Sequence, residues 1–432
     1  MKVLTVSNLY PPYYRGGYEI HCAKVAEGLR RRGHDVHVVT STYGVARGPL
    51  GPARGHQDDV NGVPVRRVLG EYAYGSTPVL PPWTINHARQ QLADARRFRE
   101  VLAEVRPDVV NWWNMNGLSK LLLPLPGEVG LGNVHCLDDQ WMVLEAGHDG
   151  RLASQFWCDL WDGRWGPAPL RPVNRAIGRW WSGRVAREGI TTRDLAIHPQ
   201  HVCFQSRYLY DLHRAAGLHF PSWEVIYGGV DVARFYAPVR PPVPASEPLR
   251  LLYAGQVSPD RGLHTAIDAL GQMPPAGRAG VTLTVAGGGS AEYIARIKAQ
   301  AEALELLDRV SFLGMVAHDR MPEVYRTHDL LLFTSTRPEG QGFTMVEALL
   351  AGCAVVTTGS GGAMEVAELA GLPVFPKNDG AALGALLTRL AADRAAVREI
   401  AAHGQRVAMK EFDSEYMLDK IESTLLRFCG GA

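Results

Sequence analysis

Runs of apolar residues alternate with longer amphipathic segments along almost the whole chain. Strands of a parallel sheet that is covered by helices on both faces read as such short apolar runs. The runs fall at 2–7, 36–40, 63–69, 108–113, 131–136, 201–205, 223–227, 249–254, 281–286, 310–313, 329–334, 354–358 and 373–375. Helices are expected between many of them, at 18–32, 84–104, from about 262, at 291–305, 319–327 and 343–352, and towards the C-terminus. This alternation predicts an α/β fold with parallel sheets.

A proline-rich stretch, residues 237–248, interrupts the alternation. It predicts a stiff connector without regular structure, and therefore a domain boundary. With 432 residues the chain is long enough for more than one domain. We expect a Rossmann-like domain at 1–236, a linker at 237–248, a second Rossmann-like domain at 249–410 and a C-terminal helix at 411–432 that can pack back on the first domain. Ligands are expected in a cleft between the two domains, because open sheets bind them beyond the carboxyl ends of their strands.

The balance of charges limits the classes of partner that the chain is expected to bind. Lys and Arg number 45 and Asp and Glu 44, which gives a formal net charge of +1. Such a chain has no overall field that would draw it to nucleic acid, so a local site must hold any anionic ligand. The six cysteines form no C-x-x-C pair, which is typical of reduced thiols in the cytoplasm. No apolar run approaches the ~18–20 residues of a membrane span, although the basic residues at 96–99 leave a peripheral membrane contact open.

One loop in the second half of the chain carries the most specific chemistry. It contains Gly340 and Gly342 and leads into a helix that is expected to start near Phe343. Glycine allows close backbone approach, and a helix start presents N–H groups and a positive dipole end to an anion. Glu339 precedes this helix and Glu347 lies about one turn inside it. Two carboxylates on either side of a phosphate-accepting helix start suit a nucleotide sugar, with ribose at one and hexose at the other. The alternative is that both are solvated acids.

Glu339 and Glu347, with seven residues between them, resemble the E-x7-E motif of retaining glycosyltransferases of family 4, which have the two-domain GT-B fold. The resemblance implies two Rossmann-like domains that face each other across a deep cleft. Further segments match the family in order and spacing over essentially the whole chain, at 12–17, 29–36, 225–235, 254–262, 285–289, 312–314 and 351–365. Each segment alone is weak evidence, but together they are specific.

The resemblance implies roles for individual residues. Glu339, Arg261 and Asp139 would be catalytic: Glu339 holds the hexose, Arg261 holds the diphosphate, and Asp139 orients or deprotonates the acceptor hydroxyl. Besides Glu339 and Arg261, the residues expected at the donor are Gly16, Gly17, Gln256, Gly314, Met315, Gly340, Gln341, Gly342, Phe343, Thr344 and Glu347. Of these, Glu347 would accept from the ribose hydroxyls, and the backbone at 314–315 would read the base.

Three positions depart from the family pattern. An Arg-x4-Lys pair normally clamps the diphosphate; here Arg261 keeps the second charge and adds a bidentate fork, whereas Gln256 at the first position is neutral. Stabilisation of the leaving nucleoside diphosphate should therefore fall on Arg261 and on the helix start. Gln341 and Phe343 stand where an aromatic or aliphatic residue and a small aliphatic residue are common. These two departures bear on the identity of the hexose more than on the reaction.

The acceptor is expected near the end of the strand at 131–136, where many members of the family carry a His-Asp pair. Registering the sequence on Trp141 puts Asp139 on the family's Asp and Asp138 at the His position. Registering on His135 leaves the acid two residues late, so the Trp141 register is preferred and His135 becomes an inward-facing strand residue. The residues expected on the acceptor side, besides Asp139, are Tyr13, His135, Asp138 and Trp141.

Residues 141–181 hold six of the ten tryptophans in what reads as an irregular stretch with Gly and Pro. Because indole faces stack on sugar rings, this stretch could form a lid over the acceptor. The plainer interpretation, which we favour, is aromatic packing within a long loop.

The sequence therefore predicts a cytoplasmic enzyme that moves a hexosyl group from a nucleotide diphosphate sugar to an acceptor hydroxyl with retention of configuration. It contains no H-x3-H, H-E-x-x-H or Asp-x-Asp pattern, so we expect neither a metal nor a cofactor. A UDP-sugar is the expected donor and a GDP-sugar the alternative; the acceptor would be a glycan, a lipid-linked glycan or a small molecule. A non-catalytic relative that binds nucleotide sugars is the alternative function, motivated by Gln256. An NAD-dependent oxidoreductase is disfavoured because the loop after the first strand lacks G-x-G-x-x-G.

Overall fold

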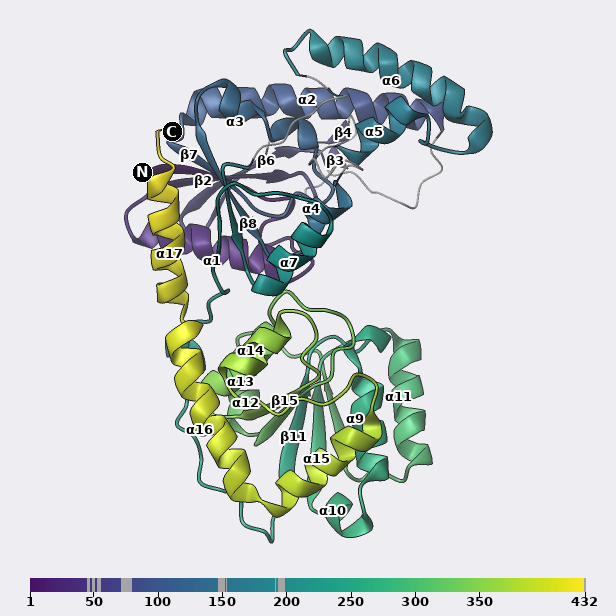
Figure 1. Ribbon diagram of the computed structural model, residues 1–432, viewed down its shortest axis with the longest axis vertical. Helices are drawn as coiled ribbons and strands as arrows, with labels where there is room; N and C mark the ends of the chain where they lie inside the picture. Colours follow the sequence, from purple (N-terminus) through teal and green to yellow (C-terminus); the bar gives the residue numbers. More distant parts are fainter. Residues whose placement is uncertain are drawn as a thin grey trace. The chain divides into compact units, whose positions relative to one another are not determined.

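The computed structural model describes the chain except for residues 45–46, 49–50, 53–55, 71–79, 147–151, 153, 191, 193–198 and 431–432. By their internal contacts the residues form two compact units, coloured along the sequence in Figure 1. The first unit consists of Met1–Gln205, Leu209–Ile226 and Leu418–Ala432, and the second of Ser206–Tyr208 and Tyr227–Met417.

The first unit is built on a sheet with the strand order β10-β9-β8-β7-β1-β2-β6-β5. Its strands are β1 (Lys2–Val6), β2 (Asp35–Ser41), β5 (His56–Val60), β6 (Val63–Leu69), β7 (Val109–Trp112), β8 (Gly132–Leu137), β9 (His201–Phe204) and β10 (Trp223–Val225). All neighbouring pairs are parallel except β5 with β6. A separate antiparallel pair joins β3 (Arg47–Gly48) and β4 (Gly51–Pro52).

Helices lie on both faces of this sheet, with α1 on one side and α2 on the other (Figure 1). This covering explains why its parallel strands are buried apolar runs. The helices are α1 (Gly17–Arg31), α2 (Pro81–Val105), α3 (Leu125–Glu128), α4 (Trp141–Leu144), α5 (Gln155–Asp162), α6 (Arg171–Ala186), α7 (Arg207–Ala215) and α17 (Ser414–Arg427), with 3-10 turns η1 (Lys120–Leu122) and η2 (Ala168–Leu170).

The second unit has a five-stranded, wholly parallel sheet in the order β13-β12-β11-β14-β15. Its strands are β11 (Leu249–Ala254), β12 (Val281–Ala286), β13 (Val310–Gly314), β14 (Leu330–Phe333) and β15 (Ala354–Thr357). Its helices are α8 (Val232–Phe235), η3 (Pro259–Arg261), α9 (Leu263–Gln272), α10 (Pro275–Ala279), α11 (Ala291–Ala303), α12 (Met321–Arg326), α13 (Phe343–Leu350), α14 (Ala363–Leu369), α15 (Gly380–Ala392) and α16 (Arg394–Glu411). Two α/β units with parallel sheets confirm the predicted fold class.

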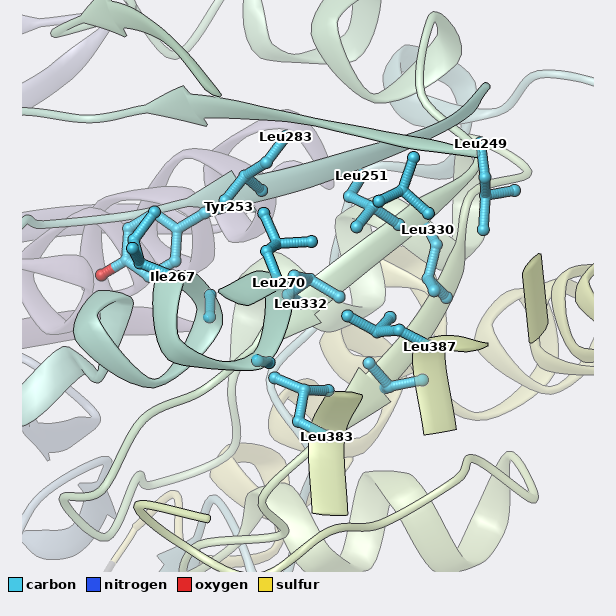
Figure 2. Packing of buried hydrophobic residues seen from close by; sticks show 14 of the residues in the cluster. Leu249, Leu251, Tyr253, Ile267, Leu270, Leu283, Leu330, Leu332, Leu383 and Leu387 are labelled. Carbon is cyan, nitrogen blue, oxygen red and sulfur yellow. The ribbon is translucent and has the colours of Figure 1, made fainter. Parts of the chain in front are cut away.

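One core of the second unit lies between its sheet and helices α9 and α15 (Figure 2). Leu251 and Leu330 point from the strands towards Leu270 of α9 and Leu387 of α15, and all four are buried. Burying a side chain of this size stabilises the unit by ~1.5–3 kcal/mol. This core fixes the strands whose carboxyl ends carry the donor-binding candidates.

The chain passes between the units at Ile226 and Tyr227, earlier than the proline-rich stretch at 237–248. That stretch has no helix or strand, but it is held on the second unit. The Ala237 carbonyl accepts from Gln405 (2.7 Å), and Arg240 pairs with Asp329 (2.6 Å). These contacts make the stretch a strap on the second unit, and residues 227–236, which were predicted for the first domain, belong to the second unit. The second unit in turn extends past 410 to Met417, and only from Leu418 do the C-terminal residues join the first unit.

Two local expectations differ from the structure. The stretch 141–181 was expected to be irregular, but its described residues form α4, α5 and most of α6; residues 147–151 and 153 lie outside the described part. The tryptophans and arginines of this stretch, together with Gly178 and Gly183 inside α6, obscured the helical pattern. The expected strand at 373–375 is reduced to one bridge between Val374 and Thr357. Among the described residues, no helix is both long enough and apolar enough to cross a bilayer.

Candidate functional site

Two of the donor-binding candidates, Arg261 and Glu339, lie in the loops that follow the carboxyl ends of β11 and β14. These strands are neighbours, and β11 lies where the strand order changes direction between β12 and β14. Loops diverge at such a switch point and leave a crevice there, which is where open sheets bind their ligands. The loop after β11 contributes Arg261, and the loop after β14, residues 334–342, contributes Glu339; we call the latter the donor loop.

Backbone contacts hold these two loops together. The Asp260 carbonyl accepts from the Thr336 amide (2.9 Å) and hydroxyl (3.1 Å), and the Arg261 carbonyl accepts from the Thr334 hydroxyl (3.0 Å). Gly262 follows in the left-handed conformation (φ +71°), and a Cβ there would lie 2.0 Å from the Thr334 carbonyl oxygen. Only glycine permits this approach. The sequence thus places Arg261 at a fixed position beside the donor loop.

Arg261 and Glu339 form the central charged pair of the crevice. The Arg261 Nη1 donates to Glu339 Oε1, which also accepts from the Ser335 hydroxyl (2.7 Å). The Nε of Arg261 is buried and has no hydrogen-bond partner. A buried N–H without an acceptor costs ~1–3 kcal/mol. The Arg261 side chain as a whole is 25% exposed, so part of its guanidinium remains open to an anionic ligand while Glu339 holds the group in place.

The backbone of Glu339 is fixed by the segment that precedes α14. Its N–H donates to the Ser360 carbonyl (3.1 Å), and its carbonyl accepts from the Gly362 N–H (2.8 Å). At Gly361 (φ +68°) a Cβ would lie 2.6 Å from the Glu339 carbonyl oxygen, so this close pairing also requires glycine. These contacts fix the backbone from which the Glu339 carboxylate extends.

Helix α13 begins directly after the donor loop, as the sequence predicts. Gly342 precedes it in the left-handed conformation (φ +95°), and no side chain caps the helix start. Gly340, Phe343 and Thr344 are all partly buried around this start. A helix start with a glycine cap offers backbone N–H groups and the positive dipole end to an anion.

Glu347 lies on α13 and is buried, so it is not a solvated acid. Its Oε1 is 3.0 Å from His318 Nε2, and its Oε2 accepts from the Tyr325 hydroxyl (2.9 Å). Burial, followed by the charge of Glu347, raises the pKa of Tyr325 and keeps this hydroxyl a donor. A carboxylate has about four acceptor sites, so Glu347 retains capacity for ligand hydroxyls.

Gln341 is buried and binds backbone. Its Oε1 accepts from the Gly228 N–H (2.6 Å), and its Nε2 donates to the Gly228 carbonyl (2.9 Å). This paired contact ties the donor loop to the segment that begins at Tyr227, where the chain enters the second unit. An aromatic or aliphatic side chain could not make it, which gives the departure from the family pattern a structural role.

The remaining donor candidates are exposed. Gln256 is exposed, and its carbonyl accepts from the Tyr253 hydroxyl (2.7 Å). Gly314 ends β13 in the left-handed conformation (φ +71°), and the Met315 side chain that follows is 80% exposed. The Met315 methyl lies over Gly288, where a Cβ would come within 3.0 Å of it. An exposed thioether beside a glycine offers a flat base an apolar surface.

In the first unit, the N-terminal glycines cap α1. Gly16 and Gly17 are exposed, but the Gly16 N–H already donates to the buried carboxylate of Glu19 (2.9 Å). The other oxygen of Glu19 accepts from Asn114 (2.9 Å). The Glu19 carboxylate therefore already accepts from the N–H group at this helix start, where an anionic ligand would otherwise bind. Tyr13 lies apart from this contact, with its ring beneath the guanidinium of Arg67 (5.1 Å).

A cluster of acids and donors follows β8; we call His21, Asn116, Asp138 and Asp139 the first-unit cluster. His21 of α1 lies 2.6 Å from Asp138 Oδ2, and both side chains are buried. Asp139 accepts from Asn116 Nδ2 (2.8 Å) and from the Trp141 N–H (3.0 Å). Burial, reinforced by the charges of Asp138 and Glu19, raises the pKa of Asp139 to about 6. A carboxyl group that titrates there suits proton transfer near neutral pH.

His135 lies on β8, buried between the rings of Trp112 and Trp141, and burial lowers its pKa to about 3. Its Nδ1 has no hydrogen-bond partner. The structure brings Asp138 and Asp139 to the end of the strand and leaves His135 inside it. The sequence did not reveal His21, which lies 117 residues before Asp138 and reaches it only because α1 packs on the sheet.

The tryptophans of 141–181 are mainly packing residues. Trp141, Trp157 and Trp181 are buried, whereas Trp180 is 56% exposed. Among the described residues, one potential metal-binding group occurs: His201, Cys203 and Glu224, outside the sites above. Arg427 contacts both His201 (3.4 Å) and Glu224 (3.3 Å), so a guanidinium already balances the charge there.

Comparison with known proteins gives two family matches that together cover most of the chain. Residues 15–234 match the model described as Glycosyltransferase Family 4, and residues 240–421 match the model described as Glycosyl transferases group 1. Among curated proteins, the chain is 24% identical over 401 residues to an uncharacterised glycosyltransferase of Methanocaldococcus jannaschii, with 88% of this chain and 86% of that protein covered.

The chain is also 25% identical over 431 residues to the glycogen synthase of Mycobacterium tuberculosis, covering 96% of this chain and 91% of the synthase. Among solved structures, Anabaena Alr3699/HepE in complex with UDP superposes with a TM-score of 0.65 at 21% identity, covering 99% of this chain and 100% of that one. A similarity at this level of identity concerns the fold, and it agrees with the GT-B class expected from the sequence.

Proposed function

The chain belongs to glycosyltransferase family 4, and on this premise we propose that it transfers a hexosyl group from a nucleotide diphosphate sugar to an acceptor hydroxyl with retention of configuration and without a metal ion. The observation that carries this proposal is the pair of Arg261 and Glu339 at the switch point of the second sheet. The guanidinium of Arg261, partly exposed and held in place by Glu339, supports a role in holding the diphosphate.

The reaction would proceed on one face of the sugar. The nucleoside diphosphate leaves while the acceptor hydroxyl enters on the same face, and the charge that develops on the diphosphate is held by Arg261 and the start of α13. Fixed donors aimed at developing charge typically supply ~2.7–4 kcal/mol of transition-state stabilisation each. Because a guanidinium and a helix start supply positive charge here, we expect no divalent ion to be needed for this step.

We propose three further donor contacts. Glu339 would accept from hexose hydroxyls, Glu347 from ribose hydroxyls, and Gly314 with Met315 would contact the base. Binding of Anabaena Alr3699/HepE to UDP supports a UDP-sugar as the first donor to test, with a GDP-sugar as the alternative. In the first unit, Asp139 would orient or deprotonate the acceptor hydroxyl.

A donor panel tests the proposal. The full chain is heated with UDP-, GDP- and dTDP-sugars, since a ligand that binds only the native state raises the melting temperature. The stabilising donor is then incubated with the protein, and the anomeric configuration of the released or transferred sugar is read by NMR in the presence and absence of EDTA. An α-configured product from an α-linked donor, unaffected by EDTA, is expected. An inverted product, or loss of turnover with EDTA, contradicts the proposal.

A non-catalytic nucleotide-sugar-binding protein is the second candidate. The observation behind it is Gln256, a neutral and exposed residue at a position where the family carries a charge. The two candidates predict the same thermal shift but differ in chemistry. Slow hydrolysis of the donor or transfer by the purified protein, absent from the Arg261→Ala variant, excludes the second candidate.

A further inference from the structure

Helix α6 presents an outer face that carries positive charge without any acid. Its sixteen residues include Arg171, Arg175, Arg179 and Arg184 and neither Asp nor Glu. In the first unit it packs against α2 and α5, and Figure 1 shows it on the side of α2 that faces away from the sheet. The whole chain is nearly neutral, so this local excess is not a consequence of composition.

The outer face is also apolar, in a helical pattern. Asn174, Gly178, Trp181, Ser182 and Val185 form the buried stripe. The opposite stripe begins at Val173, 48% exposed, and continues one helical turn at a time to the 56% exposed Trp180. Ala176 and Gly183 follow the same spacing and are exposed, and Arg187 continues it with a cation at the end of the helix. A helical spacing of three and four residues places all of these positions on one side.

The arginines of this face lack acidic partners among the described residues. The backbone carbonyls of Gly166 and Asp162 accept from Arg171 (3.0 Å) and Arg175 (2.6 Å). Within the part of the chain that the structure describes, no ion pair involves any arginine of α6. The adjoining acids are engaged elsewhere: Glu188 pairs with Arg96, and Asp162 with Arg164.

Arg184 lies over the rings of Trp180 (4.6 Å) and Trp181 (5.6 Å). This stacking holds the guanidinium beside the exposed indole. A cationic group and an amphipathic ring on one surface are the pair of features that membrane interfaces select: the indole sits at the headgroup level, and the arginine contacts lipid phosphate.

We propose that the outer face of α6, with Val173 and Trp180 as its apolar contacts and Arg179, Arg184 and Arg187 as its cationic ones, docks on an anionic lipid surface. The charges of this face are all positive, so it complements an anionic surface. The exposed indole favours a lipid surface over a partner that offers negative charge alone. The protein lies on the bilayer through this helix and does not cross it. The proposal is independent of the proposed transfer reaction.

Sedimentation with lipid vesicles tests the docking surface. The full chain is mixed with phosphatidylcholine vesicles that contain about one third phosphatidylglycerol, and with pure phosphatidylcholine vesicles. Binding to the anionic vesicles that weakens with added salt is expected. Each basic residue near such a surface contributes ~1 kcal/mol, so Arg179→Glu combined with Arg184→Glu should weaken binding at least about 30-fold.

The matched control is Arg296→Glu combined with Arg389→Glu, which changes the net charge equally on exposed helical positions of the second unit. The affinity of this control variant for the anionic vesicles should stay within about twofold of that of the wild-type protein. Equal loss in both double variants contradicts the proposal, because net charge alone would then explain binding. Circular dichroism of each variant establishes that it is folded, which the exposure of all four positions favours.

Trp180 supplies the second readout. The Trp180→Phe variant should lose the part of the tryptophan fluorescence that brominated lipids quench, and Trp180→Ala should weaken binding about tenfold at any salt concentration. Failure of the wild-type protein to bind anionic vesicles overturns the proposal. So does binding to a DNA duplex of equal phosphate concentration as tightly as to vesicles, which would identify a polyanion site.

Discussion

At the scale of single residues, the proposed reaction depends most directly on two charged groups, Arg261 and Asp139. Each is held by neighbours that fix its orientation: Glu339 and the Asp260 turn hold Arg261, and Asn116 and the Trp141 N–H hold Asp139. A group that is already oriented before the ligand binds loses less conformational entropy when it acts.

Arg261→Ala should lower turnover by ~10²-fold or more, the loss typical of removing one donor that stabilises developing charge. The steady-state rate with the donor identified by thermal shift measures it. Arg320→Ala, which removes an exposed arginine of the second unit, should leave turnover unchanged. Unchanged turnover in Arg261→Ala itself would remove this residue from the mechanism.

Asp139 should impose an acid limb on the pH profile. Burial and the charges of Asp138 and Glu19 raise its pKa to about 6, above the usual value of 3.8, so its carboxylate is protonated as the pH falls through 6. If the carboxylate serves the acceptor hydroxyl, kcat/KM falls below pH 6 and recovers above it. Asp139→Asn should lower kcat/KM and abolish this limb. A limb that persists in Asp139→Asn would assign it to another group.

At the scale of elements, the donor loop shows how much of the site the sequence could predict. Gly340 and Gly342, followed by an apolar helix with Glu347, predict a loop, a helix start and a buried acid, because backbone freedom and helical spacing are local properties. Contacts between distant segments have no such local signal. Gln341 reads as a departure from a pattern until the structure shows Gly228 opposite its amide.

This difference between local patterns and long-range contacts also explains which other predictions the structure matches. Most predicted strands of both sheets occur within one to three residues of their expected ends, because buried parallel strands have a continuous apolar signature. Helices α5 and α6 were missed because tryptophans and arginines obscured their spacing. His21 and Glu19 were missed because they act through the packing of α1 against β8 and the loop after β7, which no spacing along the chain records.

Gln341→Leu should weaken donor binding and the second unit together. It leaves the Gly228 N–H and carbonyl buried without partners, which costs ~1–3 kcal/mol, and it frees the donor loop from the segment at 227–229. We expect about a tenfold rise in the dissociation constant of the nucleoside diphosphate, measured by calorimetry, with a lower melting temperature.

Gln405→Leu is the matched control for this variant. Gln405 is also buried, and its amide donates to the Ala237 (2.7 Å) and Leu350 (2.8 Å) carbonyls, away from the donor loop. It should lose similar stability but keep the affinity for the diphosphate. If both variants lose affinity equally, Gln341 supports the unit as a whole and does not position the loop.

At the scale of the whole molecule, the two ends of the chain build one unit. Residues from Leu418 onward belong to the first unit, although the chain leaves it at Ile226. Leu418 packs so closely on α1 that a Cβ at Gly28 would lie 2.5 Å from it, and Ile421 and Leu425 are buried. The stability of the first unit therefore depends on residues that follow the entire second unit in the sequence.

Glu422 of α17 gives this dependence a measurable pH signature. Its carboxylate lies 2.6 Å from His34 Nε2 and accepts from Arg32 (2.7 Å), and these contacts lower its pKa below the usual 4.5. Because folding lowers the pKa of Glu422, its contacts with His34 and Arg32 stabilise the first unit fully above pH 4.5. This stabilisation is lost as the pH falls through the lowered pKa. Glu422→Gln should therefore lower stability at pH 7 by ~1 kcal/mol, and this difference should shrink as the pH falls below 4.5.

Tryptophan fluorescence isolates this effect, because all ten tryptophans lie in the first unit. The melting temperature that it reports should fall by about 2 °C in Glu422→Gln at pH 7, whereas Glu302→Gln, on an exposed position of α11, should leave it unchanged. A difference between wild type and Glu422→Gln that does not shrink as the pH falls to the acid limit of the folded state would show that the carboxylate's charge does not hold α17. Convergence of the two curves as the pH falls would show that the first unit is fastened by the charge on its C-terminal helix.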